Sequence, residues 1–223
     1  MLKVDHLTIG YDSRALVRDI SFELAPGECV LLAGPNGTGK TTLLKWLASG
    51  EAAVVLIPTN IPKVKGFTVE AFVRTGCYRE SDWRGRISKE VEGRTEEALK
   101  MLGIEGLKGR DISTLSDGEF QKACLATGLT RKAEVLLLDE PTAHLDVENR
   151  IDVLRTLREV ARKTGTAVLF SSHDLHDALQ VADRVFVLTR DGRFLASPSV
   201  ISSKVEKSTV LRAAFPALEP DTL

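Results

Sequence analysis

Residues 34–41 read GPNGTGKT, and this stretch decides the fold. It follows an apolar run and leads into helical spacing at residues 41–48. Gly34, Gly37 and Gly39 allow the backbone to curl so that successive N–H groups point inward around phosphate oxygens. The pattern GxxxxGK[ST] between a strand and a helix therefore predicts a phosphate-binding loop and disfavours a plain glycine-rich turn.

The other residues of this loop have side chains that suit a nucleoside triphosphate. Lys40 would bring a positive charge to the β- and γ-phosphates, and the Thr41 hydroxyl can ligate Mg²⁺. The expected nucleotide-binding residues of the loop are Asn36, Gly37, Thr38, Gly39, Lys40, Thr41 and Thr42.

A second motif, EVLLLDEP at residues 134–141, places acidic side chains after an apolar run. A strand buried on both faces would deliver Asp139 at its carboxyl end, where ligands bind in open α/β sheets. Asp139 could then hold Mg²⁺ through its water shell. Glu140 could polarise an attacking water as a general base. The structural alternative is a strand-terminal turn marked by Pro141.

Composition places the chain among ordinary globular proteins. Hydrophobic residues make up 43% and charged residues 27% of its 223 residues. A formal net charge of −1 gives no bulk attraction to nucleic acid, so we expect none as a partner. No apolar run approaches the ~20 residues that cross a bilayer, and the opening MLKVDHL lacks signal-peptide features. We therefore expect a cytoplasmic chain.

Three cysteines, Cys29, Cys77 and Cys124, lie far apart, with neither metal-ligand nor redox spacing. We expect reduced and mostly buried thiols.

Strands alternate with helices after a β-rich start. The fold class is therefore α/β, with a mostly parallel sheet covered by helices. Residues 2–12 read as one strand, and residues 20–34 as two strands around a Pro-Gly turn. Further strands are expected at residues 54–58, 134–139, 166–172 and 184–190. Helices are expected at residues 41–48, 69–75, 89–102, 118–131, 148–163 and 175–181.

The last part of the chain, after residue 190, has sequence patterns that indicate local structure but no function. An Asp-Gly pair at residues 191–192 signals a hairpin. Residues 196–208 look like a polar linker, and a short helical tail follows.

Residues 114–122 read TLSDGEFQK and contain a capping box, Ser116 with Glu119 three positions later. Such a helix start is also an anion site, because its N–H groups are free and its dipole end is positive. The residues alone leave open whether this is only a helix start or also half of a phosphate site.

The ordered set of motifs resembles the ATP-binding cassette (ABC) family. The set comprises the phosphate loop, LSDGE, LLLDEP, then AHLD at residues 143–146 and SSHD around His173, and it covers nearly the whole chain. The resemblance implies a P-loop NTPase core, a reduced N-terminal antiparallel β subdomain and a helical signature subdomain. It also implies one domain over residues 1–223, with the signature subdomain at about 68–131 and a tail at about 198–223.

The resemblance also implies roles for individual residues. Ser116 and Gly118 would contact the γ-phosphate of ATP held by the opposite subunit, so the capping box would serve both purposes. His173 would contact the γ-phosphate and the catalytic water. Tyr11 would stack on adenine, although a plain strand aromatic fits it almost as well. Residues 143–146 would cross the dimer.

Two departures from the family pattern bear on activity. The family usually has a glutamine where this chain has Thr59, with Asn60 as the alternative alignment. The short connection from Lys40 to Thr59 implies that the antiparallel subdomain is reduced. Asp117 and Glu119 replace a glycine and a glutamine of the signature, and each carboxylate would repel a triphosphate unless it points away or pairs with a cation.

The resemblance implies an ATPase that uses ATP and Mg²⁺ and drives transport through a separate membrane permease. Its expected partners are a second copy of itself, permease subunits and an external substrate-binding protein. The expected place is the inner face of the cell membrane. Importers of chelated iron, haem or cobalamin are the most similar subclass. A soluble ABC ATPase and a poorly hydrolysing ATP sensor stay open as alternatives.

Overall fold

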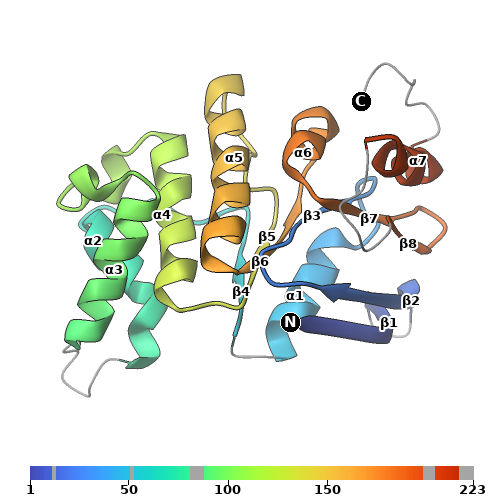
Figure 1. Ribbon diagram of the computed structural model, residues 1–223, viewed down its shortest axis with the longest axis horizontal. Helices are drawn as coiled ribbons and strands as arrows, with labels where there is room; N and C mark the ends of the chain where they lie inside the picture. The colour runs from blue at the N-terminus through green and yellow to red at the C-terminus, as the bar shows by residue number, and fades with distance from the viewer. Residues whose placement is uncertain (12–13, 51–52, 81–87, 198–203, 216–223) are drawn as a thin grey trace. The chain divides into compact units, whose positions relative to one another are not determined.

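Figure 1 shows the computed structural model, which describes residues 1–11, 14–50, 53–80, 88–197 and 204–215. Contacts divide the chain into two units. The first unit comprises Met1–Thr59, Glu134–Ala143 and Leu157–Leu223. The second comprises Asn60–Ala133 and His144–Thr156.

A six-stranded sheet forms the centre of the first unit, in the order β4-β5-β6-β3-β7-β8. All neighbouring pairs are parallel except β7 with β8, which are antiparallel. Every residue of β3, β5, β6 and β7 is buried, so both faces of the sheet are covered, as predicted. The strands are β3 (Cys29–Ala33), β4 (Val54–Ile57), β5 (Val135–Leu138), β6 (Ala167–Ser171), β7 (Arg184–Leu188) and β8 (Phe194–Ala196).

A two-stranded antiparallel sheet, β1 (Leu2–Tyr11) with β2 (Arg14–Leu24), precedes the central sheet in the chain. Its buried side chains belong to the same hydrophobic cluster as those of the central sheet. The Phe22 ring, for example, lies 4.8 Å from the Phe186 ring, centroid to centroid. The prediction of a reduced N-terminal antiparallel subdomain is confirmed.

Helices α1 (Lys40–Gly50), α6 (Leu175–Val181) and α7 (Lys204–Ala214) belong to the first unit. Helix α1 packs on β4 and β5, α6 on β3 and α7 on β7. The first two match their predicted positions. The third corrects a prediction, because α7 begins at Lys204, inside the stretch 196–208 that was expected to be a polar linker. The polar composition of residues 204–208 does not indicate a helix. Packing against the first unit stabilises one there, because Leu211 of α7 is fully buried.

The second unit is helical, with α2 (Val69–Arg74), α3 (Lys89–Met101) and α4 (Asp117–Thr130) in mutual contact (Figure 1). The side chains of Thr68, Ser88 and Ser116 cap the three N-termini by accepting a backbone N–H bond. The 3₁₀ turns η1 (Thr75–Glu80), η2 (Glu105–Leu107) and η3 (Ile112–Thr114) lie between these helices along the chain.

Helix α5 (Val147–Thr164) contributes residues to both units. Within the described ranges, none of the helices is long and apolar enough to cross a membrane.

Candidate functional site

The loop between β3 and α1 has the backbone conformation that its glycines predict. Gly37 and Gly39 have φ angles of 80° and 103°, in the left-handed region that glycine tolerates best. A Cβ atom on Gly34 would lie 2.5 Å from the backbone oxygen of Leu188, which no real side chain could accommodate. Glycine is therefore required at Gly34 by space and favoured at the other two positions by conformation.

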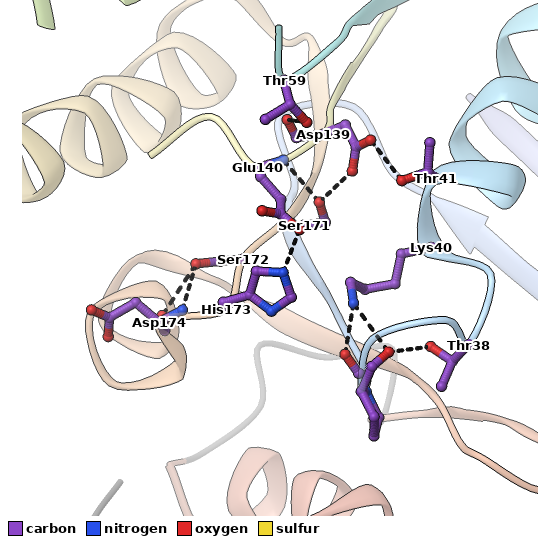
Figure 2. A network of polar contacts seen from close by, with 12 residues as sticks. Thr38, Lys40, Thr41, Thr59, Asp139, Glu140, Ser171, Ser172, His173 and Asp174 are labelled. Atoms are coloured by element: carbon purple, nitrogen blue, oxygen red, sulfur yellow. Dashed lines mark hydrogen bonds and ion pairs between the residues drawn. The ribbon is translucent and has the colours of Figure 1, made fainter. Parts of the chain in front are cut away.

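Lys40 lies buried at the first turn of α1, and its ammonium group points back into the loop (Figure 2). Its Nζ donates to the carbonyl oxygens of Gly34 at 2.7 Å and Pro35 at 3.3 Å. Burial lowers the pKa of Lys40, while the nearby carboxylates of Glu140 and Asp139 act in the opposite direction. The loop thus holds one buried amine whose positive charge would be favoured further by a bound anion.

The other predicted loop residues differ in exposure. Thr38 is buried, and its hydroxyl donates to the Pro35 carbonyl at 2.9 Å, so this side chain supports the loop itself. Asn36, Gly37 and Thr41 are exposed, and Thr42 is half-buried.

A polar hollow of about 470 Å³ adjoins the loop. Asn36, Gly37 and Thr38 line one part of it, and the side chains of Arg14 and Arg190 line another. Tyr11, the predicted adenine-stacking residue, is the last residue of β1, and its side chain lies outside the described residues.

Asp139 follows β5 at the carboxyl end of the sheet and is buried. The Thr41 hydroxyl donates to its Oδ2 atom at 2.7 Å. In the described part of the chain, no cluster of three or more His, Cys, Asp or Glu side chains could hold a metal. Two hard oxygen donors nevertheless fit Mg²⁺, which keeps several waters and binds through one or two protein ligands plus substrate phosphates. Thr41 and Asp139 are therefore the residues that would hold it.

Glu140 and His173 meet beside this pair (Figure 2). The His173 Nε2 atom lies 2.5 Å from the Glu140 Oε1 atom. The Glu140 side chain is 27% exposed and that of His173 is 49% exposed, so both can reach solvent or a ligand. The two predicted catalytic residues thus contact each other, although they are 33 positions apart in the sequence.

Two hydroxyl groups complete the cluster: that of Ser171, which the sequence analysis did not single out, and that of Thr59, which it noted only as a departure from the family pattern. Ser171 is fully buried; its Oγ atom donates to Asp139 Oδ1 at 2.9 Å and accepts from the Glu140 N–H at 2.9 Å. The Thr59 hydroxyl donates to the backbone oxygen of Asp139 at 2.8 Å. Ser171 is the first residue of SSHD and lies within the strand predicted at residues 166–172, and that position was the available signal.

The signature residues belong to the second unit. Ser116 is the N-cap of α4, where its hydroxyl accepts the Glu119 N–H at 3.2 Å and the Glu119 carboxylate accepts the Ser116 N–H at 2.8 Å. The predicted capping box is therefore confirmed. The bond from the Ser116 N–H is the main reason that the pKa of Glu119 is lowered. The Glu119 carboxylate thus turns back on its own helix start.

Asp117 pairs with a cation. The Lys63 Nζ atom lies 2.6 Å from Asp117 Oδ1, donates to the Leu115 carbonyl at 2.9 Å, and stands 5.4 Å from the centre of the Phe120 ring. The sequence prediction had left open whether Asp117 would be offset by a cation, and Lys63 provides one.

Gly118 packs closely on the beginning of α5. A Cβ atom there would lie 2.6 Å from the Asn149 Oδ1 atom, and the Asn149 amide is held by Asp146 at 2.8 Å. Close packing against Asn149 within the second unit therefore favours glycine at position 118.

The glycine loop, the buried lysine and the Thr41–Asp139 pair at the carboxyl end of parallel strands together define the class of P-loop nucleotide-binding proteins. Comparison with known families narrows the class. The sequence profile described as ABC transporter matches residues 17–143, more than half of the chain. The chain therefore belongs to the ABC transporter family, and the predicted resemblance is confirmed.

Curated relatives are similar over most of their length. The chain is 31% identical to the petrobactin import ATP-binding protein FpuC of Bacillus anthracis, over 85% of this chain and 78% of that protein. It is 32% identical to the zinc import ATP-binding protein ZnuC of Jannaschia sp., over 92% of this chain and 86% of that protein.

Solved structures share the fold. A metal-chelate type ABC transporter in an inward-facing conformation superposes with a TM-score of 0.83 at 22% identity, over 96% of this chain and 88% of that one. At this identity the likeness shows the fold alone.

Proposed function

We propose that this chain is the ATP-hydrolysing subunit of a membrane importer for a metal or a metal chelate. The observation that carries the proposal is the convergence of Thr41, Asp139, Glu140 and His173 at the mouth of the glycine loop. These groups supply a metal-binding carboxylate, a base and an imidazole within one cluster, as suits hydrolysis of the phosphoanhydride bond of ATP.

Each candidate site residue of the first unit then has a defined role in ATP binding or hydrolysis. Lys40 exchanges its two carbonyl acceptors for oxygens of the β- and γ-phosphates. Mg²⁺, when bound, neutralises phosphate charge, and Thr41 and Asp139 hold it. Glu140 accepts a proton from the attacking water, and His173 orients that water and the γ-phosphate. Tyr11 stacks on the adenine ring.

The second unit serves a second copy of the chain. We propose that two copies close head-to-tail around two MgATP, with Ser116 and Gly118 of each copy against the γ-phosphate held by the other. The Lys63–Asp117 pair offsets the acidic residue that would otherwise oppose closure. The same pair weakens the reason for regarding the protein as a poorly hydrolysing ATP sensor.

Transport requires a separate permease, which places the subunit at the inner face of the cell membrane. Relatives named for petrobactin import and zinc import support a metal-containing cargo. The cargo itself would be recognised by the permease and by an external binding protein. Uptake of labelled ferric chelates and zinc, compared between cells with the wild-type gene and its Lys40→Ala form, would identify it.

The test of the ATPase proposal is Glu140→Gln. This variant keeps the shape and polarity of the side chain but removes the base, so hydrolysis should fall on the order of 100-fold while ATP binding persists. The ATP-bound dimer should accumulate and be visible by light scattering. Wild-type turnover in this variant would remove Glu140 from the mechanism, and absence of turnover in the wild-type protein would favour the ATP-sensor alternative.

A further inference from the structure

The peptide that joins Asp139 to Glu140 lies just beyond the paired part of the sheet. Strand β5 is paired with β4 as far as Leu138 opposite Ile57, and with β6 as far as Leu138 opposite Phe170. Past these pairs, the Asp139 carbonyl and the Glu140 N–H have no place in the regular ladder. Backbone groups that leave a ladder in a buried region require other partners.

Two side-chain hydroxyls satisfy the two ends of this one peptide (Figure 2). Thr59, which follows β4, donates to the Asp139 carbonyl at 2.8 Å. Ser171, the last residue of β6, accepts the Glu140 N–H at 2.9 Å. Because β4 and β6 flank β5, the peptide is held from both sides.

The Ser171 hydroxyl also holds the side chain of Asp139, the residue before Glu140. It donates its proton to Asp139 Oδ1 at 2.9 Å, which leaves Oδ2 for the Thr41 hydroxyl at 2.7 Å. With both oxygens engaged, the Asp139 carboxylate cannot rotate without breaking a hydrogen bond.

The backbone of Glu140 is held in an unfavourable conformation. Its φ angle is 52°, in the left-handed region that residues with a Cβ atom rarely adopt. Such a conformation persists only where the surroundings impose it. The same conformation accompanies a side chain whose Oε1 atom lies 2.5 Å from His173 Nε2.

We propose that Thr59 and Ser171 are positioning residues that together form a hydroxyl clamp on the Asp139–Glu140 peptide. The clamp orients the Glu140 carboxylate toward the reacting water and, through Ser171, the Asp139 carboxylate toward the metal. The hydroxyl at position 59 thus has a task of its own in this chain. The inference rests on the proposed roles of Asp139 and Glu140.

Two readouts test the clamp. Thr59→Val and Ser171→Ala remove one hydroxyl each, and Thr59→Ser retains it. We expect kcat for ATP hydrolysis to fall on the order of tenfold in the first two variants, with KM for ATP nearly unchanged and with rescue in Thr59→Ser. Only Ser171→Ala should also raise the Mg²⁺ concentration at half-maximal rate, because only that variant frees the Asp139 carboxylate.

The second readout does not depend on activity. Hydrogen exchange of the Glu140 amide, followed by NMR in the full chain, should speed up about tenfold or more in Ser171→Ala, because its acceptor is gone. The matched control is Ser172→Ala, a neighbouring buried serine whose hydroxyl bonds only to the Asp174 backbone among the contacts described. That variant should leave the Glu140 amide unchanged.

The outcomes separate the clamp from the proposed function. Equal exchange of the Glu140 amide in wild type and Ser171→Ala would overturn the clamp, whatever the activity. Faster exchange with wild-type kcat would show a purely structural contact and overturn the positioning role. If Glu140→Gln hydrolyses ATP normally, the proposed role of Glu140 fails, and the exchange rates still decide whether the peptide is clamped.

Discussion

Replacing Lys63 by methionine would remove the cation that offsets the acidic signature. Lys63 makes three contacts within the second unit: an ion pair with Asp117 at 2.6 Å, a hydrogen bond to the Leu115 carbonyl at 2.9 Å and a contact with the Phe120 ring at 5.4 Å. Methionine keeps most of the aliphatic stem, so the change tests the charged end of the side chain.

The magnitude follows from exposure. The Asp117 side chain is 64% exposed and that of Lys63 is 26% exposed, so the ion pair is screened and contributes about 0.5 kcal/mol. The bond to the Leu115 carbonyl contributes about 1 kcal/mol, and the ring contact about 0.5 kcal/mol. A loss near 2 kcal/mol corresponds to a fall in Tm of about 4–8 °C for a chain of this size.

Lys122→Met is the matched control for this change. The Lys122–Asp152 pair lies in the same unit, has the same length of 2.6 Å and has similar exposures of 21% and 57%. Among the described residues, the Lys122 ammonium group makes no hydrogen bond to a carbonyl and no contact with an aromatic ring. Loss of this ion pair should therefore lower Tm by only about 1–2 °C. Thermal melts of both variants, without nucleotide and in low and high salt, give the comparison.

The nucleotide arm of the experiment uses the Glu140→Gln background. Lys63→Met leaves Asp117 without its cation and should weaken ATP-dependent dimerisation, whereas Asp117→Asn should strengthen it; both effects should shrink in high salt. Equal Tm losses in Lys63→Met and Lys122→Met, together with unchanged dimerisation, would refute the reasoning.

Two further changes test other parts of the molecule. Lys40→Ala should abolish turnover and weaken nucleotide binding at least tenfold, measured with a fluorescent ATP analogue, because the loop loses its only buried ammonium group among the described residues. The cysteines should resist a thiol reagent at pH 8 until the chain unfolds, since all three are buried and burial raises the pKa of Cys124 to about 12 and that of Cys29 further. Rapid labelling of the folded protein would contradict their burial.

Features that depend on neighbouring residues could be predicted from the sequence. The start of α4 follows from Ser116 and Glu119, which lie one helical turn apart and satisfy each other's backbone. Helix α6 begins and ends where its apolar spacing does, and β5 coincides with an uninterrupted apolar run. The phosphate loop and Asp139 could be predicted because each is marked by a short local pattern: spaced glycines before a lysine in the first case, and an acidic residue directly after an apolar strand in the second.

Features that depend on distant residues could not be predicted. Lys63 and Asp117 are 54 positions apart, and Thr59 and Asp139 are 80 positions apart, so no periodicity relates them. The effect of Ser171 on both acidic residues required knowledge that β6 lies beside β5. Helix α7 was missed at its start because its stability comes from packing against β7.

Strand β3 is the inner strand from which the phosphate loop emerges, and its two neighbours in the sheet, β6 and β7, both come from the last part of the chain. During synthesis the ribosome therefore delivers CVLLA long before either neighbour exists. Pairings over such sequence distances form slowly, and an unpaired apolar strand invites association with other nascent chains. The nucleotide loop is thus among the first motifs to be translated, yet the strands on both sides of β3 are complete only after Leu188 has been added to the chain.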